Sequence, residues 1–241
     1  FLMKEKIEKK RLAIVPARGG SKRIIRKNVK QFLGKPIILR VLDQVSASNL
    51  FTEIHVSTED KEISELVSKA GYKPRFSRDA SLAGDETPLS EVLRSVLKEY
   101  HKIGESFETI ALIFATAVLI DHHVLEKAME EFENGDTTVQ LLSVAKYPTP
   151  IEKAMRIGQD NHLVPVNLES MCLPSNNLSD SYFETGDFVI YDEEGLMCNS
   201  PHPLKRGFRL HPWQSVDIDN KEDWDLAEYF YLMKKNISNN R

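Results

Sequence analysis

The sequence predicts a three-layer α/β/α domain, Rossmann-like, around a mostly parallel β-sheet. Short β-branched and apolar runs alternate along the chain with longer stretches whose apolar residues recur at helical spacing. The chain has 241 residues and is 41% hydrophobic, which is enough to bury one large core. In this fold class ligands bind beyond the carboxyl ends of the strands, so we expect functional residues in the loops that follow them.

Three strand–helix units fill the first half of the sequence. The apolar runs that predict strands cover residues 12–15, 53–57 and 109–114. Amphipathic helices are predicted over residues 36–47, 63–70 and 88–100. Gly71 directly follows the second of these helices and is the residue type that commonly ends a helix.

The second half is less regular. We expect a helix at 124–132 and a closing helix at 224–233, with strands at 138–144, 187–191 and 215–218. Residues 146–181 break the pattern with prolines and short alternating runs. They are therefore interpreted as hairpins and loops inserted into a single domain that spans residues 11–241.

Composition excludes several classes of protein. A net charge of −4 argues against a nucleic-acid or membrane-surface protein, whose footprint would be a basic excess. No run approaches the roughly 18 apolar residues of a membrane span. Cys172 and Cys198 offer neither a disulfide framework nor the paired spacing of a zinc site, so both are interpreted as structural and the compartment as cytoplasmic. The seven histidines show no ligand spacing and receive no role.

The loop after the first predicted strand is the most informative stretch. Residues 18–30 contain two glycines and no acid, together with six cationic residues: Arg18, Lys22, Arg23, Arg26, Lys27 and Lys30. Gly19 and Gly20 let backbone amides approach an anion, and the cations can neutralise several phosphates, so the loop predicts a polyphosphate ligand. The pattern is neither the dinucleotide-binding glycine fingerprint nor the P-loop. The alternative is a solvated surface loop.

This loop also carries a family resemblance. Val15-Pro-Ala-Arg-Gly-Gly-Ser-Lys-Arg-Ile-Ile-Arg-Lys-Asn28, with Gly34-Lys35-Pro36, resembles the signature of the CMP-nonulosonate cytidylyltransferases, which are sugar nucleotidyltransferases that use CTP. The resemblance implies a nucleotidyltransferase fold and catalytic roles for Arg18 and Lys27. It implies that the triphosphate is bound by Ala17, Arg18, Gly19, Gly20, Ser21, Lys22, Arg23, Lys27 and Asn28. The family usually has proline where Ile25 stands, which predicts a more flexible loop in this chain.

The resemblance continues through two further segments. Val56-Ser-Thr-Glu-Asp60 is similar to the family's sequence, and Arg78-Asp-Ala-Ser-Leu-Ala-Gly-Asp85 resembles its base-recognising loop. This implies that Arg78, Asp85 and Thr87 bind the nucleotide, with Arg78 and the backbone around Thr87 near cytosine. A plain polar surface loop is the alternative for this stretch.

The end of the third predicted strand bears on the sugar. Phe114-Ala-Thr-Ala-Val118 resembles the Ala-Thr-Ala-Pro pattern of pseudaminic acid cytidylyltransferases, whereas sialic acid enzymes show Gln-Pro-Thr-Ser-Pro. Tyr147-Pro-Thr-Pro-Ile-Glu-Lys-Ala154 and Phe183-Glu-Thr-Gly-Asp-Phe188 resemble the same subfamily. The implied sugar-binding residues are Phe114, Ala115, Thr116, Gly186, Asp187, Phe188 and Gln214. Val118, Thr185 and Asp187 depart from the more usual proline, alanine and glutamine.

A pair of acids near the carboxyl terminus is the candidate metal site. Asp217 and Asp219 are two residues apart at the end of a predicted strand, so their carboxylates would point the same way and suit Mg²⁺. The alternative is that Asp219 or Asn220 caps the helix expected to begin near Lys221. Gln214-Ser-Val-Asp-Ile-Asp219 resembles the family block that supplies the metal carboxylates, which implies catalytic roles for both acids and Mg²⁺ as the cofactor.

The residues and the resemblance together predict a cytidylyltransferase that transfers CMP from CTP to the anomeric hydroxyl of an acidic nine-carbon sugar. Pseudaminic acid is the first choice of sugar. The alternatives are sialic, legionaminic and 3-deoxy-octulosonic acids and, in another class, a non-catalytic nucleotide-binding protein. We expect no nucleic-acid or membrane partner. The family is commonly dimeric, which implies a homodimer in which residues 146–181 reach the partner and contribute to the sugar pocket.

Overall fold

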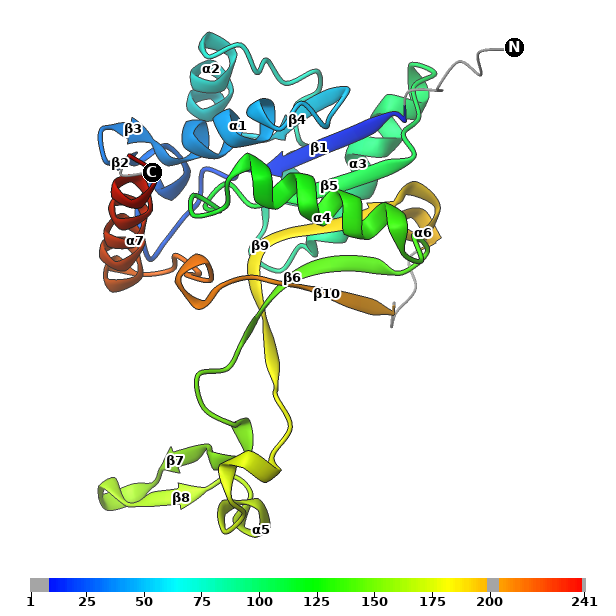
Figure 1. Ribbon diagram of the computed structural model, residues 1–241. Helices are drawn as coiled ribbons and strands as arrows, with labels where there is room; N and C mark the ends of the chain where they lie inside the picture. The colour runs from blue at the N-terminus through cyan, green and yellow to red at the C-terminus, as the bar shows by residue number, and fades with distance from the viewer. Residues whose placement is uncertain (1–8, 199–203, 240–241) are drawn as a thin grey trace.

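A six-stranded sheet with the strand order β10-β6-β9-β5-β1-β4 forms the centre of the molecule (Figure 1). The computed structural model describes residues 9–198 and 204–239. The strands of this sheet are β1 (Arg11–Pro16), β4 (Glu53–Ser57), β5 (Thr109–Ile113), β6 (Gln140–Lys146), β9 (Tyr182–Asp192) and β10 (Lys205–Arg209). Among these strands only β9 runs antiparallel to its neighbours, so the mostly parallel sheet is confirmed.

Helices cover both faces of the sheet and complete the three predicted layers (Figure 1). They are α1 (Ile37–Ala47), α2 (Lys61–Lys69), α3 (Leu89–Lys102), α4 (His122–Asn134), α6 (Glu193–Cys198) and α7 (Lys221–Asn239). Alternate residues of β1 enter different cores. Ala13 and Val15 pack in the cluster that contains α1 and α4, whereas Leu12 and Ile14 pack with α3. Because side chains alternate along a strand, one short buried strand supports both layers.

A short hairpin follows the basic loop. β2 (Gln31–Phe32) and β3 (Lys35–Pro36) are antiparallel, and Leu33 and Gly34 join them with φ values of 48° and 82°. Two successive positive φ values are typical of a tight hairpin turn and favour glycine at the second position. The 3₁₀ helices near the site are η1 (Lys27–Val29), η2 (Ala80–Ala83) and η6 (Pro212–Gln214).

The chain between β6 and β9 forms an arm that projects away from the sheet (Figure 1). It contains β7 (Met155–Ile157), β8 (Leu163–Pro165), α5 (Leu168–Met171), η3 (Ile151–Lys153), η4 (Gln159–Asn161) and η5 (Ser175–Asn177). β7 and β8 pair as an antiparallel hairpin. Lys153 ties the arm together, because its Nζ donates to the carbonyl oxygens of Met171 at 2.6 Å and Leu173 at 2.5 Å. Large apolar side chains on the arm stay exposed, including Ile157 at 71% and Leu168 at 73%.

The strand expected at residues 215–218 is absent, and β10 was not predicted. Residues 215–218 follow η6 as irregular chain, and the Ser215 N–H donates to the Pro212 carbonyl oxygen at 3.3 Å. In the described part of the chain no strand pairs with them. β10 instead pairs with β6 at the edge of the sheet. Its Lys-Arg-Gly-Phe-Arg sequence has no apolar run that would predict a strand. Charged side chains of this kind are common on edge strands. Gly207 allows the close pairing, since a Cβ there would lie 2.8 Å from Val144 Cγ2.

The two cysteines lie at the surface. Cys172 and Cys198 are free and exposed, so the interpretation of both as structural residues is wrong. Within residues 9–198 and 204–239, no helix is both long and apolar enough to cross a membrane.

Candidate active site

A cavity of about 310 Å³ opens at the carboxyl ends of β1 and β5. Its volume is in the range of small-molecule sites, and its position agrees with the general rule for parallel sheets. The predicted site residues that line it are Arg18, Ser21, Lys22, Arg23, Lys27, Asn28, Arg78, Asp85, Thr87, Phe114, Ala115, Thr116 and Asp219. The predicted site residues outside its lining are Ala17, Gly19, Gly20, Gly186, Asp187, Phe188, Gln214 and Asp217.

The cationic residues of the loop divide into two groups. Arg18, Lys22, Arg23 and Lys27 line the cavity. Arg26 turns away and donates to both oxygens of Asp60 at 2.6 and 3.0 Å, and its hydrogen bonds lower the pKa of that carboxyl. Lys30 Nζ lies 4.5 Å from the ring centroid of Trp224. Only the first group is therefore placed to bind an anion in the cavity. Arg26 and Lys30 instead contact residues outside the cavity and fix the shape of the loop.

The cavity cations are paired with carboxylates of the cavity itself. Arg18 and Lys22 both donate to Asp85, Lys22 at 2.7 Å, and their hydrogen bonds lower the pKa of Asp85. Arg23 and Lys27 contact Asp219 at 2.8 and 3.3 Å. The Lys22 and Arg23 side chains are 81% and 69% exposed. Such exposed pairs are weak, so a multiply charged anion can replace the carboxylates as the partner.

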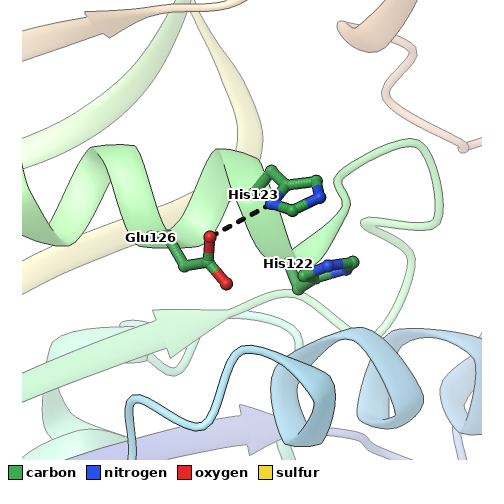
Figure 2. Close-up of side chains that lie close together, drawn as sticks. All are labelled: His122, His123 and Glu126. Atoms are coloured by element: carbon green, nitrogen blue, oxygen red, sulfur yellow. Dashed lines mark hydrogen bonds and ion pairs between the residues drawn. The ribbon is translucent and has the colours of Figure 1, made fainter.

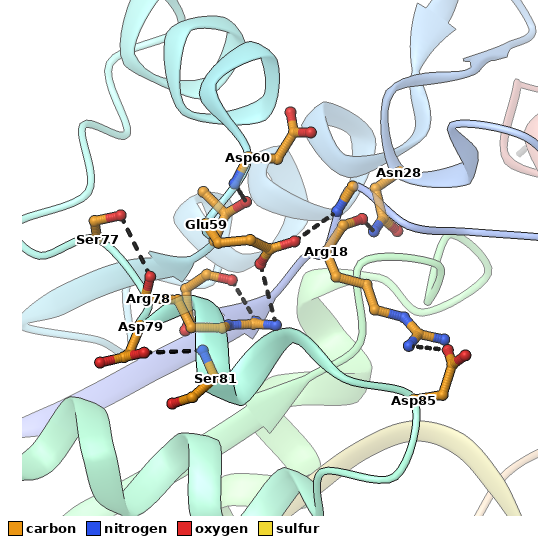
Figure 3. A network of polar contacts seen from close by, with 12 residues as sticks. Arg18, Asn28, Glu59, Asp60, Ser77, Arg78, Asp79, Ser81 and Asp85 are labelled. Carbon is orange, nitrogen blue, oxygen red and sulfur yellow. Dashed lines mark hydrogen bonds and ion pairs between the residues drawn. The ribbon is translucent and has the colours of Figure 1, made fainter.

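Backbone hydrogen bonds fix the first part of the loop (Figure 3). Asn28 Nδ2 donates to the Arg18 carbonyl oxygen at 2.9 Å, and the Gly19 N–H donates to Glu59 Oε1 at 3.0 Å. A Cβ at Gly19 would lie 2.2 Å from Asp60 Oδ2, so a side chain there would displace the Asp60 carboxylate, whereas an added Cβ at Gly20 would meet nothing within 4 Å. Gly19 thus allows the approach of an acid from the α2 terminus rather than exposing its amide to the cavity.

Arg78 is built into the cavity wall (Figure 3). Its Nε donates to Ser57 Oγ at 3.1 Å and its Nη2 to the Ser57 carbonyl oxygen at 2.5 Å, which ties η2 and its flanking loop to the end of β4. Its side chain is 5% exposed, and Glu59 Oε2 lies 3.6 Å from Nη1. Burial lowers the pKa of Arg78. The guanidinium therefore fixes the wall next to the cavity and presents only its remaining edge to a ligand.

The helix cap near the carboxyl terminus does not use the carboxylates of Asp217 and Asp219. Asn220 Oδ1 accepts the Asp223 N–H at 2.9 Å, and Asp223 Oδ2 accepts the Asp219 N–H at 3.0 Å. Asn220 is thus the residue that caps α7, and neither carboxylate of the predicted metal pair is used for capping. Burial raises the pKa of Asp217, and the nearby charge of Asp219 raises it further. Gln214 is buried, and its Oε1 accepts the His211 N–H at 3.2 Å.

A third carboxyl group lies behind this pair. Asp187 on β9 is 3% exposed, and its Oδ2 has no hydrogen-bond partner among the described residues. Burial raises its pKa to about 8, a side-chain hydrogen bond with Thr185 acts against this rise, and the charge of Asp217 contributes to it. Gly186 brings Asp217 against β9: its φ is +69°, and a Cβ there would lie 3.8 Å from the Asp217 carboxyl.

The donor set of these acids suits a hard divalent cation. All the candidate ligand atoms are carboxylate oxygens, which Mg²⁺ prefers. Among the described residues no Lys, Arg or His forms an ion pair with Asp217 or Asp187. Burial is the main cause of the raised pKa of each, and for Asp217 the charges of Lys27 and Arg23 act in the opposite direction. The residues therefore fit Mg²⁺.

A family model described as cytidylyltransferase matches residues 12–238. The chain belongs to the cytidylyltransferase family. Both the resemblance of the basic loop and the α/β nucleotidyltransferase fold are thereby confirmed.

Several curated proteins are similar to this cytidylyltransferase over nearly their whole length. The pseudaminic acid cytidylyltransferase of Campylobacter jejuni strain 81-176 is 29% identical over 231 residues, covering 92% of this chain and 96% of the relative. The CMP-N,N'-diacetyllegionaminic acid synthase of Legionella pneumophila is 26% identical, covering 90% and 94%. A solved CMP:2-keto-3-deoxy-manno-octonic acid synthetase complexed with CTP superposes with a TM-score of 0.68 at 15% identity, covering 94% of this chain and 99% of that one. At that identity the last similarity shows the fold alone.

Sequence reasoning about this cytidylyltransferase missed Glu59. It holds Gly19 and Arg78 together, although no predicted role was given to it. The available signal was its position directly after β4, because the carboxyl ends of parallel strands gather functional side chains.

A histidine cluster on α4 was missed as well (Figure 2). The potential ligand atoms of His122, His123 and Glu126 lie within 4.8 Å of one another. Each ring already has a partner: His122 Nδ1 lies 3.3 Å from Gln44 Oε1, and His123 Nδ1 lies 3.1 Å from Glu126 Oε2. The i, i+4 spacing of His122 and Glu126 could have indicated the cluster, which lies outside the cavity lining.

Proposed function

We propose that this cytidylyltransferase transfers CMP from CTP to the anomeric hydroxyl of a nonulosonic acid, with pseudaminic acid the first choice, and releases pyrophosphate. The observation that carries the proposal is the convergence of Arg18, Lys22, Arg23 and Lys27 on one cavity that also receives Asp219. The similarity to pseudaminic and legionaminic acid enzymes supports this class of sugar.

The cavity cations would bind the triphosphate. These four cations attract the negative charge of CTP, and charge-assisted bonds to phosphate are stronger than those between neutral groups. The sugar hydroxyl oxygen forms a bond to the α-phosphorus as the bond to the pyrophosphate oxygen breaks, so positioning and charge neutralisation supply most of the rate. Lys27 is well placed for this role, because its Nζ is anchored by the Ile218 carbonyl oxygen at 2.5 Å beside Asp219.

Asp217 and Asp219 would hold Mg²⁺. When bound, the ion neutralises phosphate charge and makes a coordinated hydroxyl more acidic. The residues themselves keep Asp219 between Arg23 and Lys27, so the same carboxylate joins the phosphate-binding loop to the carboxyl-terminal segment. Loss of that carboxylate should therefore disturb both metal binding and the position of two cations.

The end of β5 supports the choice of sugar. Phe114, Ala115 and Thr116 line the cavity as a mostly apolar wall, which suits a deoxygenated sugar bearing methyl and acyl groups. Val118, where the subfamily usually has proline, is 3% exposed and lies outside the lining. Its N–H donates to the Thr116 carbonyl oxygen at 2.7 Å, a bond that proline could not make. Valine in place of proline at position 118 therefore changes the turn that follows Thr116 and leaves the apolar cavity wall unchanged.

Two further parts of the proposal concern assembly and location. The arm carries exposed apolar side chains at Ile157 and Leu163, 71% and 59% exposed, which a homodimer would cover. Light scattering should give a dimer mass for the wild type and a monomer mass for Ile157→Asp combined with Leu163→Asp. A monomeric wild type at every concentration would refute the dimer. Free exposed thiols at Cys172 and Cys198 favour the reducing cytoplasm.

Pyrophosphate release tests the activity. Purified protein is given CTP and MgCl₂ with pseudaminic, legionaminic, sialic or 3-deoxy-octulosonic acid. We expect release with pseudaminic acid, a loss of at least about a hundredfold in Asp219→Asn, and wild-type rates in Asp225→Asn, which removes an exposed acid of α7 paired with Lys221. Release with another sugar would keep the chemistry and replace the substrate. No pyrophosphate release with any of the four sugars would favour the non-catalytic nucleotide-binding alternative.

A further inference from the structure

Two histidines and a glutamate converge at the start of α4, outside the lining of the active-site cavity (Figure 2). The potential ligand atoms of His122, His123 and Glu126 lie within 4.8 Å of one another. Glu126 follows the two histidines at i+4 and i+3, the spacings at which side chains meet on one helix face. The ring centroids of His122 and His123 are 4.0 Å apart. Three side chains from the start of one helix are therefore within reach of one ion.

A glutamine on α1 fixes the orientation of the His122 ring. Gln44 Oε1 accepts the His122 backbone N–H at 3.2 Å, which identifies this atom as an acceptor. The same oxygen lies 3.3 Å from His122 Nδ1, so Nδ1 carries the ring proton and donates it, while Nε2 carries the lone pair. Histidines that bind metals usually donate their second ring N–H to such an oxygen, which sets the tautomer and the ring orientation. His122 therefore has the supporting contact that a metal ligand needs.

His123 and Glu126 are already close to the geometry of two ligands of one ion. His123 Nδ1 lies 3.1 Å from Glu126 Oε2. Two ligand atoms of a four-coordinate zinc ion, bonded at about 2.0–2.1 Å, are about 3.3 Å apart. An ion can therefore take the place of the proton between them, with the ring proton of His123 moving to Nε2. Separations of up to 4.8 Å must close by at most about 1.5 Å, and the His123 and Glu126 side chains are 69% and 42% exposed and have room to rotate.

The donor set favours a transition metal over Mg²⁺. Imidazole nitrogens suit Zn²⁺, whereas Mg²⁺ prefers oxygen ligands. The start of a helix carries a partial positive charge, which opposes a cation there. The Glu126 carboxylate offsets this charge from the same face of the helix, and it contacts His123 at 3.1 Å. Two neutral nitrogen donors and one carboxylate therefore form a set that suits a zinc ion and differs from the oxygen-only set in the active site.

We propose that His122, His123 and Glu126 bind a zinc ion, with water as the fourth ligand and Gln44 as the outer partner of His122. The site gives a role to two histidines to which the sequence analysis assigned none, and it does not depend on the proposed Mg²⁺ pair or on turnover. Because Gln44 lies on α1 and the ligands lie on α4, the bound ion would stabilise the packing of these two helices on one face of the sheet.

Binding of Co²⁺ and Zn²⁺ tests the site without substrate. Titrations are made in excess MgCl₂, which occupies sites built from oxygen ligands. All proteins carry Cys172→Ser and Cys198→Ser, because exposed thiols also bind Zn²⁺. We expect this parent to bind one Co²⁺ per chain, with the intense visible absorption of a four-coordinate ion, and one equivalent of Zn²⁺ to displace it. His123→Ala and Glu126→Gln should each weaken Zn²⁺ binding by at least about tenfold.

His101→Ala is the matched control. His101 also pairs with a glutamate, Glu193, at 2.6 Å, but the described part of the chain places no third ligand beside that pair. Its affinity for Zn²⁺ should equal that of the parent. Gln44→Ala keeps all three ligands and removes only the contact that orients His122, so it should weaken binding by about tenfold. Loose association of ions with surface histidines would not respond to this change.

Thermal unfolding gives a second readout. ZnCl₂ should raise the Tm of the parent and of His101→Ala, and it should have much less effect on His123→Ala, because stabilisation by a ligand depends on its affinity. His123 is 69% exposed, so its replacement should leave the Tm without metal unchanged. A parent that binds no Zn²⁺, or equal affinity in His123→Ala, Glu126→Gln and His101→Ala, would overturn the inference.

Discussion

Glu59 couples the basic loop to Arg78, and replacing it should measure both contacts. Its Oε1 accepts the Gly19 N–H at 3.0 Å, and its Oε2 lies 3.6 Å from Arg78 Nη1 (Figure 3). Arg78 is 5% exposed, so loss of the negative charge leaves a buried guanidinium that, within residues 9–198 and 204–239, hydrogen-bonds only to Ser57. Removing one partner of a buried pair costs about 3–5 kcal/mol, but the 3.6 Å separation and the 20% exposure of Glu59 reduce the expected loss to about 1–3 kcal/mol.

Thermal unfolding of Glu59→Gln and Glu59→Ala provides the measurement. Glu59→Gln keeps an acceptor for Gly19 and should lose about 1–3 kcal/mol, which lowers Tm by about 2–12 °C for a protein of this size. Glu59→Ala also loses the hydrogen bond and should be about 1 kcal/mol less stable again. Because both contacts shape the cavity wall, KM for CTP should rise in the same order.

Glu62→Gln is the matched control. Its carboxylate is 67% exposed and pairs with Arg26 at the surface, where such a pair contributes about 0–1 kcal/mol. An unchanged Tm in Glu59→Gln, or a larger loss in Glu62→Gln, would refute the reasoning that burial makes the Glu59 contact the stronger one.

Two further variants test charges in and beside the site. Asp85→Asn should tighten the binding of CTP and of inorganic pyrophosphate by about threefold at low salt, because it frees Arg18 and Lys22 from a competing carboxylate. This gain in affinity, measured by calorimetry, should shrink as the salt concentration rises. Weaker binding would show that Asp85 is instead a nucleotide ligand. Burial lowers the pKa of His55 from 6.5 to about 4, so between these pH values His55 is protonated in the unfolded chain and neutral in the folded one. The free energy of unfolding should therefore fall by about 3 kcal/mol as pH drops from 6.5 to 4. His55→Gln should flatten this part of the pH profile in urea unfolding, and an unchanged slope would show that other groups cause it.

The fold was largely predictable because its signals are local. Buried parallel strands such as β5 are continuous apolar runs, and the helices that cover them repeat at helical spacing. β10 escaped this reasoning because an edge strand is stabilised by pairing with β6 rather than by an apolar sequence. The strand expected at residues 215–218 did not form, because a short local pattern does not reveal whether a pairing partner exists.

The site was predictable in its residue types but not in its contacts. The charge of the basic loop predicted an anion site, yet Arg26 points to Asp60, a partner 34 residues away in the sequence. Asp187 was read from the resemblance as part of the sugar wall, whereas it lies buried behind that wall. Such outcomes depend on tertiary partners, which no local pattern encodes.

The missing proline at position 25 illustrates the same limit. Ile25 is 77% exposed, so the prediction of a more flexible loop rests on backbone freedom alone. The structure instead holds both sides of this position, with Arg26 bonded to Asp60 and Asn28 bonded to the Arg18 carbonyl oxygen. Long-range side-chain contacts therefore supply restraint that the sequence analysis attributed to proline.

Product identification tests the central claim most directly. Purified protein is incubated with CTP, MgCl₂ and pseudaminic acid, and the products are measured by mass spectrometry. CMP transfer predicts a CMP-pseudaminic acid conjugate and an equal molar amount of pyrophosphate. Unchanged CTP, or free CMP without a conjugate, in the presence of pseudaminic, legionaminic, sialic and 3-deoxy-octulosonic acids would contradict it.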